Sequence, residues 1–180
     1  MDNLKLRRLH PRLLILNRGE IAIRIAKAAR ELGIHTIGVR AEADSNCLHV
    51  FHVDECVTLA VKDPVAGFLD VAAVIELAKA NRADSLHPGY GFLSENAQLA
   101  QVCADSGICF VGPKPEHLTL FGSKTRSKEL AQSCGVPTLE GSGVVRSLHE
   151  AEAFVKRCGL PVIIKAVFGG TQASSESLRL

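Results

Sequence analysis

The sequence contains no tryptophan and only one tyrosine among its 180 residues. It also lacks any apolar run near the roughly 20 residues of a membrane-spanning helix, so we expect no membrane segment. Its 21 basic and 19 acidic residues are mixed along the chain, and no basic patch predicts binding to nucleic acid. With aromatic residues so scarce, a composition of 47% hydrophobic residues predicts an aliphatic core and suits buried strands of Val, Ile and Leu.

The six cysteines include no C-x-x-C pair and follow no secretory signal. Reduced thiols in a cytoplasmic protein are therefore expected, since disulfides belong to oxidising compartments. The basic start "MDNLKLRRLHPR" leaves a mitochondrial location open, although it lacks serine and contains Asp2.

Short apolar segments alternate with amphipathic helical segments over the first 112 residues, as in β-α-β units. This pattern predicts an α/β fold with a Rossmann-like, doubly wound parallel sheet. The predicted strands cover residues 12–16, 35–39, 55–60, 84–87 and 108–112. The main helices are expected near residues 21–32, 70–80 and 95–106.

A few polar residues predict where helices begin. Asn17 and Glu20 have the spacing of a capping box for the first helix, and Ser94 is a candidate cap for the helix that follows it. Ser147 and Glu150 have the same capping-box spacing and predict a helix from about residue 148.

The pattern changes after residue 122 and predicts the beginning of a second domain rather than a complete one. A polar helix, an extended segment, another helix and an apolar strand follow each other there. We expect an N-terminal extension over 1–11, a first domain over 12–122, part of a second over 123–170, and a divergent tail over 171–180.

Two glycine-containing loops follow predicted strands. The first, "NRGE", contains only Gly19 of a G-x-G-x-x-G pattern, so a structural turn is favoured over dinucleotide binding. The second, "HPGYG", lies just past the fourth strand, where open α/β sheets bind ligands. It either presents Tyr90 to a ligand or forms a turn with a packed tyrosine.

His49, His52, Asp54 and Cys56 resemble a metal-ligating set in composition. On a strand, however, alternate side chains point to opposite faces and do not converge on one ion. Surface and edge positions are therefore the better interpretation, and no metal site is expected.

Two lysines have a route to a phosphate. Lys124 follows Gly122 at a predicted helix start, and Lys165 lies in an apolar strand just before Gly169 and Gly170. A buried ammonium needs an anionic partner, so Lys165 favours a nucleotide site; an edge-strand lysine that reaches water is the alternative.

Four stretches occur in a fixed order and together resemble the N-terminal part of biotin carboxylase. They are "LNRGEIAIRIAKAARELGI", "LHPGYGFLSENAQLA", "FVGPKPEHLTLFGSK" and "LPVIIKAVFGG". The resemblance implies an ATP-grasp ligase that uses ATP and Mg²⁺ to activate bicarbonate and carboxylates biotin on a carrier domain. Among such enzymes, the stretch "IIKAVFGG" is most similar to pyruvate carboxylase.

The resemblance also implies site residues. Lys124, Lys165, Gly169 and Gly170 match positions that contact ATP, although Ser123 replaces the family's usual aspartate. Tyr90 and Gly91 match a loop beside the biotin and bicarbonate pocket.

The tail "TQASSESLRL" departs from the family, in which more glycines and a basic residue follow. The family's Mg²⁺ ligands and catalytic residues belong beyond Leu180, so no catalytic residue is expected in this chain and it is expected to be inactive alone. A truncated gene model, an alternative transcript and a frameshift are equally compatible with this tail. A further expectation is exposed apolar surface on the strand of Ile163 and Ile164, a hazard for solubility.

Two alternatives remain open at this stage. One is a non-catalytic truncated isoform that binds full-length carboxylase subunits through the first domain. The other is a fragment of a different ATP-grasp ligase, against which "NRGEIA" and "HPGYGFLSEN" argue jointly.

Overall fold

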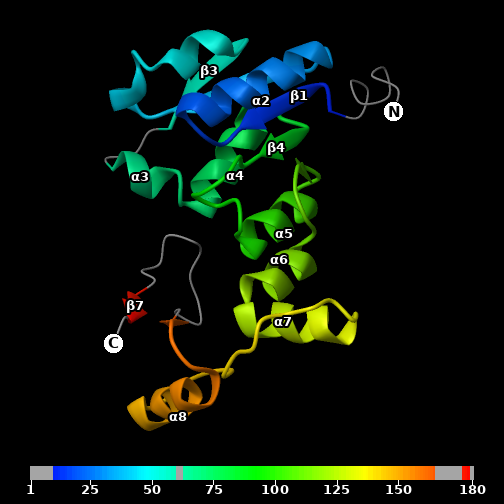
Figure 1. The fold of residues 1–180 in the computed structure, drawn as a ribbon. Helices are drawn as coiled ribbons and strands as arrows, with labels where there is room; N and C mark the ends of the chain where they lie inside the picture. The colour runs from blue at the N-terminus through cyan, green and yellow to red at the C-terminus, as the bar shows by residue number, and fades with distance from the viewer. Residues whose placement is uncertain (1–9, 60–62, 165–175, 179–180) are drawn as a thin grey trace. The chain divides into compact units, whose positions relative to one another are not determined.

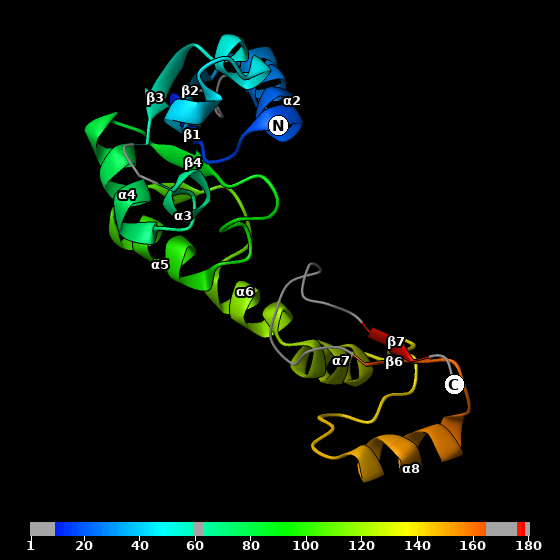
Figure 2. The same cartoon turned by 90° about the vertical axis from the view of Figure 1, so that its left-hand side faces the viewer.

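The structure is a computed structural model that describes residues 10–59, 63–164 and 176–178. The chain divides into two compact units, Met1–Pro115 and Glu116–Leu180. Figures 1 and 2 draw the chain as a ribbon from two directions.

The first unit is built on a five-stranded sheet with the strand order β3-β2-β1-β4-β5. All four neighbouring pairs are parallel, so the predicted doubly wound parallel sheet is confirmed. The strands are β1 (Arg12–Ile15), β2 (His35–Arg40), β3 (Glu55–Thr58), β4 (Ser85–His87) and β5 (Cys109–Phe110).

Helices cover both faces of this sheet (Figures 1 and 2). Because side chains alternate along a strand, Leu13 and Ile15 of β1 point to one face and Leu14 to the other. Leu13 and Ile15 pack in one core cluster with the apolar side of α2 (Gly19–Glu31). Leu14 packs in a second cluster with residues of α4 (Val71–Ala80) and α5 (Ala97–Asp105). The aliphatic composition thus supplies two cores, one on each side of the sheet.

Three short helical segments complete the first unit: the 3-10 helices η1 (Glu42–Asp44) and η2 (Leu48–His52), and α3 (Pro64–Gly67). The helical turn of η2 directs His49 into the interior, where it is fully buried. The prediction of a surface or edge position for His49 was therefore wrong, because it assumed an extended strand.

Two of the predicted helix caps were also wrong. The N-cap of α2 is Arg18, and no side chain caps that helix end. Asn96, not Ser94, caps α5 by accepting a hydrogen bond from the Leu99 N–H at 2.8 Å.

The cap at Ser147 is confirmed in part. Its hydroxyl accepts from the Glu150 N–H at 3.3 Å and begins α8 (Leu148–Cys158). The Glu150 carboxylate accepts from the Arg146 N–H at 2.8 Å rather than from the N–H of Ser147.

The second unit contains most of α6 (Pro115–Gly122), then α7 (Lys124–Ser133), α8 and a two-stranded antiparallel sheet. In that sheet β6 (Val162–Ile164) pairs with β7 (Glu176–Leu178), so part of the divergent tail forms a strand. Between residues 116 and 164, no described side chain is buried.

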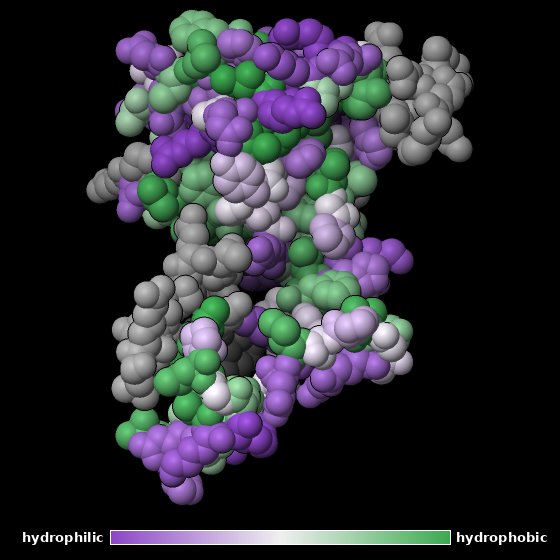
Figure 3. Space-filling model, in the orientation of Figure 1, coloured by the Kyte–Doolittle hydropathy of each residue, from purple (hydrophilic) through white to green (hydrophobic). Residues whose placement is uncertain are grey.

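Hydrophobic residues lie at the surface of this second unit beside hydrophilic ones (Figure 3). The side chains of Ile163 and Ile164 are 63% and 42% exposed. The prediction of exposed apolar surface on this strand is confirmed.

Candidate functional site

The candidate site lies at the carboxyl ends of β1 and β4, which are neighbours in the sheet and pair through Ile15 and His87. From β1 the chain proceeds outward to β2 and β3, and it then returns to place β4 on the other side of β1. The strand order therefore reverses between β1 and β4. Open α/β sheets bind ligands outside the carboxyl ends of the strands at such a reversal.

Asn17 follows β1 and connects the two loops that meet there. Its side chain is only 3% exposed. The Nδ2 amide donates to the carbonyl oxygens of Pro88 and Tyr90, each at 2.8 Å, and Oδ1 accepts from the Arg18 N–H at 2.9 Å. The predicted capping box of Asn17 and Glu20 is replaced by contacts with a loop some 70 residues further along the chain.

Glu20, in the first turn of α2, contacts the same loop. The Tyr90 hydroxyl donates to Glu20 Oε1 at 2.6 Å, and this hydrogen bond raises the pKa of the tyrosine. The Tyr90 side chain is 62% exposed, so the loop presents its tyrosine at the surface and does not pack it in a turn.

The backbone of this loop depends on glycine at two positions. Gly89 and Gly91 both have φ of +68°, a region that side chains rarely adopt. A Cβ atom at Gly89 would also lie 2.5 Å from Asn17 Nδ2. The close approach of the two loops therefore requires glycine at residue 89.

His87, the last residue of β4, forms a hydrogen bond with the backbone of this loop. Its Nδ1 accepts a hydrogen bond from the Gly89 N–H at 3.0 Å, which requires an unprotonated Nδ1. Burial lowers the pKa of His87 and so favours the neutral ring.

Arg18 lies beside the site with its guanidinium over two aromatic rings, 6.0 Å from the Phe68 centroid and 5.7 Å from that of Phe92. It also pairs with Asp44 Oδ1 at 3.4 Å. Phe92 has φ of +41°, which is strained for a residue with a side chain, and stacks on the buried Phe68 with centroids 5.0 Å apart. The stacking of Phe92 on Phe68 fixes the position of the chain just after Gly91.

His49 lies near this ion pair, and neither of its ring nitrogens meets hydrogen-bond geometry with a described residue. Burial lowers the pKa of His49, outweighing the Val39 backbone and the Asp44 carboxylate, which raise it.

No three His, Cys, Asp or Glu side chains converge on a possible metal site within residues 10–59 and 63–164. Of the set that resembled metal ligands, Asp54 instead accepts from the N–H and hydroxyl of Thr36, at 2.8 and 2.7 Å. These bonds lower the pKa of Asp54.

The residues expected to contact ATP belong to the second half of the chain. Lys124 is the first residue of α7 and is exposed. Ser123 is the N-cap of α7 and accepts from the Arg126 N–H at 3.4 Å, the role that an aspartate also performs at a helix start. Lys165, Gly169 and Gly170 lie outside the described residues.

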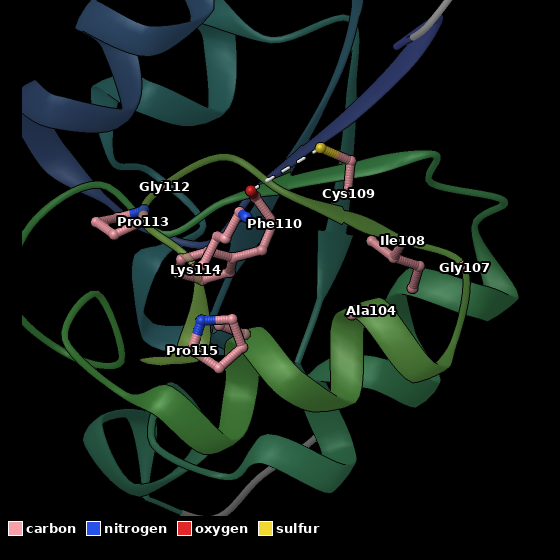
Figure 4. A pocket seen from close by; sticks show the side chains of 10 residues that line it. Ala104, Gly107, Ile108, Cys109, Phe110, Gly112, Pro113, Lys114 and Pro115 are labelled. Carbon is pink, nitrogen blue, oxygen red and sulfur yellow. Dashed lines mark hydrogen bonds between the residues drawn. The ribbon is translucent and has the colours of Figure 1, made fainter. Parts of the chain in front are cut away.

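A separate open hollow of about 410 Å³ lies along the edge strand β5 (Figure 4). Small residues of α5, β5 itself and the segment Gly112–Pro115 line it. None of the residues predicted for the site belongs to this lining.

Comparison with known proteins identifies the family. The family profile described as "Biotin carboxylase, N-terminal domain" matches residues 10–118. The chain belongs to the biotin carboxylase family. A second profile, "Carbamoyl-phosphate synthase L chain, ATP binding domain", matches residues 123–175. In the part of the chain that the structure describes, no helix has the length and apolarity needed to cross a membrane.

The similar proteins include pyruvate carboxylases and biotin carboxylases. The chain is 45% identical to pyruvate carboxylase of Bacillus subtilis over 161 residues and 46% identical to biotin carboxylase of Nostoc over 160. Each alignment covers 88% of this chain, but only 14% and 36% of those relatives. The chain therefore corresponds to the N-terminal part of the biotin carboxylase region, and its family and fold are those expected from the sequence.

A solved structure supports the same assignment. The biotin carboxylase domain of Hydrogenobacter thermophilus 2-oxoglutarate carboxylase, in complex with MgADP, ADP and bicarbonate, superposes with a TM-score of 0.88 at 38% identity. The match covers 95% of this chain and 38% of that domain.

Proposed function

We propose that this chain supplies the N-terminal wall of an ATP-dependent biotin carboxylase site and does not turn over by itself. The observation that supports this most directly is the Tyr90 loop, which lies exposed at the reversal of strand order in a sheet of this family. In the proposal, Tyr90 and Gly91 face the pocket in which biotin and bicarbonate react.

Lys124, together with Lys165, Gly169 and Gly170, is proposed to contact ATP. A lysine at the start of a helix suits a phosphate because the ammonium and the backbone N–H groups act on the same anion. ATP and the biotin carrier domain are accordingly the proposed partners. The proposed domain boundary falls between residues 122 and 123, between the two profile matches.

The described residues do not fit a complete catalytic centre. Phosphoryl transfer depends on metal ions that neutralise the developing charge, and no three His, Cys, Asp or Glu side chains of the described residues gather into a set that could hold one. We therefore expect no bicarbonate- and biotin-dependent ATP hydrolysis by the isolated 180-residue chain.

A chimera tests the positive part of the proposal. Residues 10–118 would replace the matching part of the Nostoc biotin carboxylase, and ATP hydrolysis would be measured with bicarbonate and free biotin. The chimera should be active, and Tyr90→Ala should lower its kcat/KM for biotin about tenfold, or ~1.4 kcal/mol.

Gln101→Ala serves as the matched control, because Gln101 is exposed on α5 and should leave the kinetics unchanged. If Tyr90→Ala leaves the kcat/KM of an active chimera for biotin unchanged, Tyr90 does not line the pocket. Biotin-dependent turnover by the isolated chain would contradict its proposed inactivity.

A further inference from the structure

The fold alone does not explain the amide at residue 17. Asn17 follows the central strand β1 and is 3% exposed, where an apolar side chain would pack without a polar cost. Burial of an amide costs free energy unless its hydrogen bonds are replaced. Asn17 replaces them almost entirely with the Tyr90 loop, so the reason for the amide lies in that loop.

The orientation of this amide follows from its partners. Both atoms that approach Nδ2 are carbonyl oxygens, which only accept, while Oδ1 faces the Arg18 N–H, which only donates. An aspartate at the same position would place a carboxylate against two carbonyl oxygens. The site thus distinguishes Asn from its nearest isostere.

The hydroxyl of Tyr90 is oriented as well. Glu20 Oε1 accepts its hydrogen at 2.6 Å, so the phenolic oxygen has only lone pairs left for a ligand. The Glu20 carboxylate beside it repels anions. The tyrosine therefore suits a neutral ligand group with an N–H donor and disfavours a carboxylate or bicarbonate.

We propose that Asn17 and Glu20 are positioning residues, which fix the Tyr90 loop and turn its hydroxyl hydrogen away from the ligand, so that Tyr90 offers an acceptor to a ligand N–H. The inference rests on the proposed function for the identity of the ligand, a ureido N–H being the group that fits. His87 and Gly89 complete the same unit through their hydrogen bond at 3.0 Å.

The composition of the chain makes a direct test possible. Tyr90 is the only tyrosine and there is no tryptophan, so tyrosinate absorbance during a pH titration reports this one residue. In the wild-type chain the midpoint should lie above the ordinary tyrosine value of 10.0, because Glu20 accepts the hydrogen bond.

Glu20→Gln removes the charge and should move the midpoint down toward the ordinary value. Asn17→Leu leaves Glu20 in place and adds no charge but releases the loop, and it should move the midpoint in the same direction. Glu31→Gln, at the other end of the same helix α2, is the matched control and should leave the midpoint unchanged. Far-UV circular dichroism would confirm that each variant is folded.

The inference is overturned if folded Glu20→Gln or Asn17→Leu keeps the wild-type midpoint. Should Asn17→Leu not fold, Gly89→Ala makes the same test, since its Cβ would displace the loop from Asn17 Nδ2. These results concern only the geometry of the chain, whereas failure of the proposed function would appear in the kinetics of the chimera.

Discussion

Asn17 Nδ2 donates a hydrogen bond of 2.8 Å to the carbonyl oxygen of Tyr90, 73 residues later in the chain. Together with the bond from Asn17 Nδ2 to Pro88, this contact joins the loop after β1 to the loop after β4. Both loops belong to stretches that resemble biotin carboxylase, and the structure brings the two into contact.

Removal of the Asn17 amide should destabilise the first unit. Asn17→Ala leaves the carbonyl oxygens of Pro88 and Tyr90 without this donor, and a buried unsatisfied group costs about 1–3 kcal/mol. Urea unfolding followed by circular dichroism would measure the loss. Gln101→Ala removes an exposed amide bonded to Asp105 and should change the free energy of unfolding by less than about 0.5 kcal/mol. Equal effects of the two substitutions would contradict the role given to Asn17.

Stability should fall as the pH decreases from about 7 toward 5. His49 and His87 have pKa values below the ordinary 6.5 in the folded chain, because both are buried. Unfolding therefore takes up protons in this range, and the stability present above the ordinary pKa is lost as the pH falls toward the folded values. The carboxyl group of Asp54, whose pKa is lowered, contributes a further loss only below about pH 4.

His87→Asn separates these contributions, since the Asn oxygen can accept from the Gly89 N–H without titrating. Urea unfolding at several pH values should show a smaller loss for this variant between pH 7 and 5. The loss below pH 4 should be unchanged. A His87→Asn curve parallel to that of the wild type would argue against titration of His87.

The six free thiols should react in a defined order with a disulfide reagent. Four of them are exposed, Cys56 is half-buried, and Cys103 is buried with its pKa raised to about 11. The thiolate is the reactive form, so Cys103 should react only after unfolding. Mass spectrometry of the labelled peptides would identify each site, and early labelling of Cys103 would contradict the buried position. The exposed thiols are Cys47, Cys109, Cys134 and Cys158.

The β6 strand should limit solubility. Ile163 is 63% exposed, and exposed apolar residues on a strand favour association between chains. Ile163→Lys should reduce light scattering at high protein concentration while leaving the stability of the first unit unchanged. Ala153→Lys, at an exposed position of α8, adds the same single positive charge and is therefore the control for added charge. Scattering that falls equally in both variants would assign the effect to net charge.

Local sequence patterns predicted the strands of the sheet, but they did not predict the contacts between the loops that follow β1 and β4. The apolar run at residues 12–16 predicted β1 almost to the residue, because burial on both faces leaves a continuous signal. The predicted strand at 108–112 pairs over only two residues, because its neighbour β4 is itself only three residues long.

The wrong predictions fall where contacts with distant parts of the chain, or a short helical turn, override the local pattern. The spacing of Asn17 and Glu20 suits a capping box, yet both side chains bond to the Tyr90 loop, which a local pattern does not contain. His49 was assigned to the surface by strand alternation, whereas the 3-10 helix η2 turns it inward. For Tyr90 the sequence left presentation and packing in a turn both open, and the structure shows the exposed alternative.

The central place of β1 has a consequence for synthesis on the ribosome. β1 is made first among the strands, and its partner β4 follows about 70 residues later. At ~5–20 residues per second, the β4 edge of β1 waits for roughly 4–14 s after it emerges. During that interval the β1-α2-β2 unit, whose two strands are parallel, leaves the β4 edge of β1 unpaired, and an unpaired strand edge favours association with other chains.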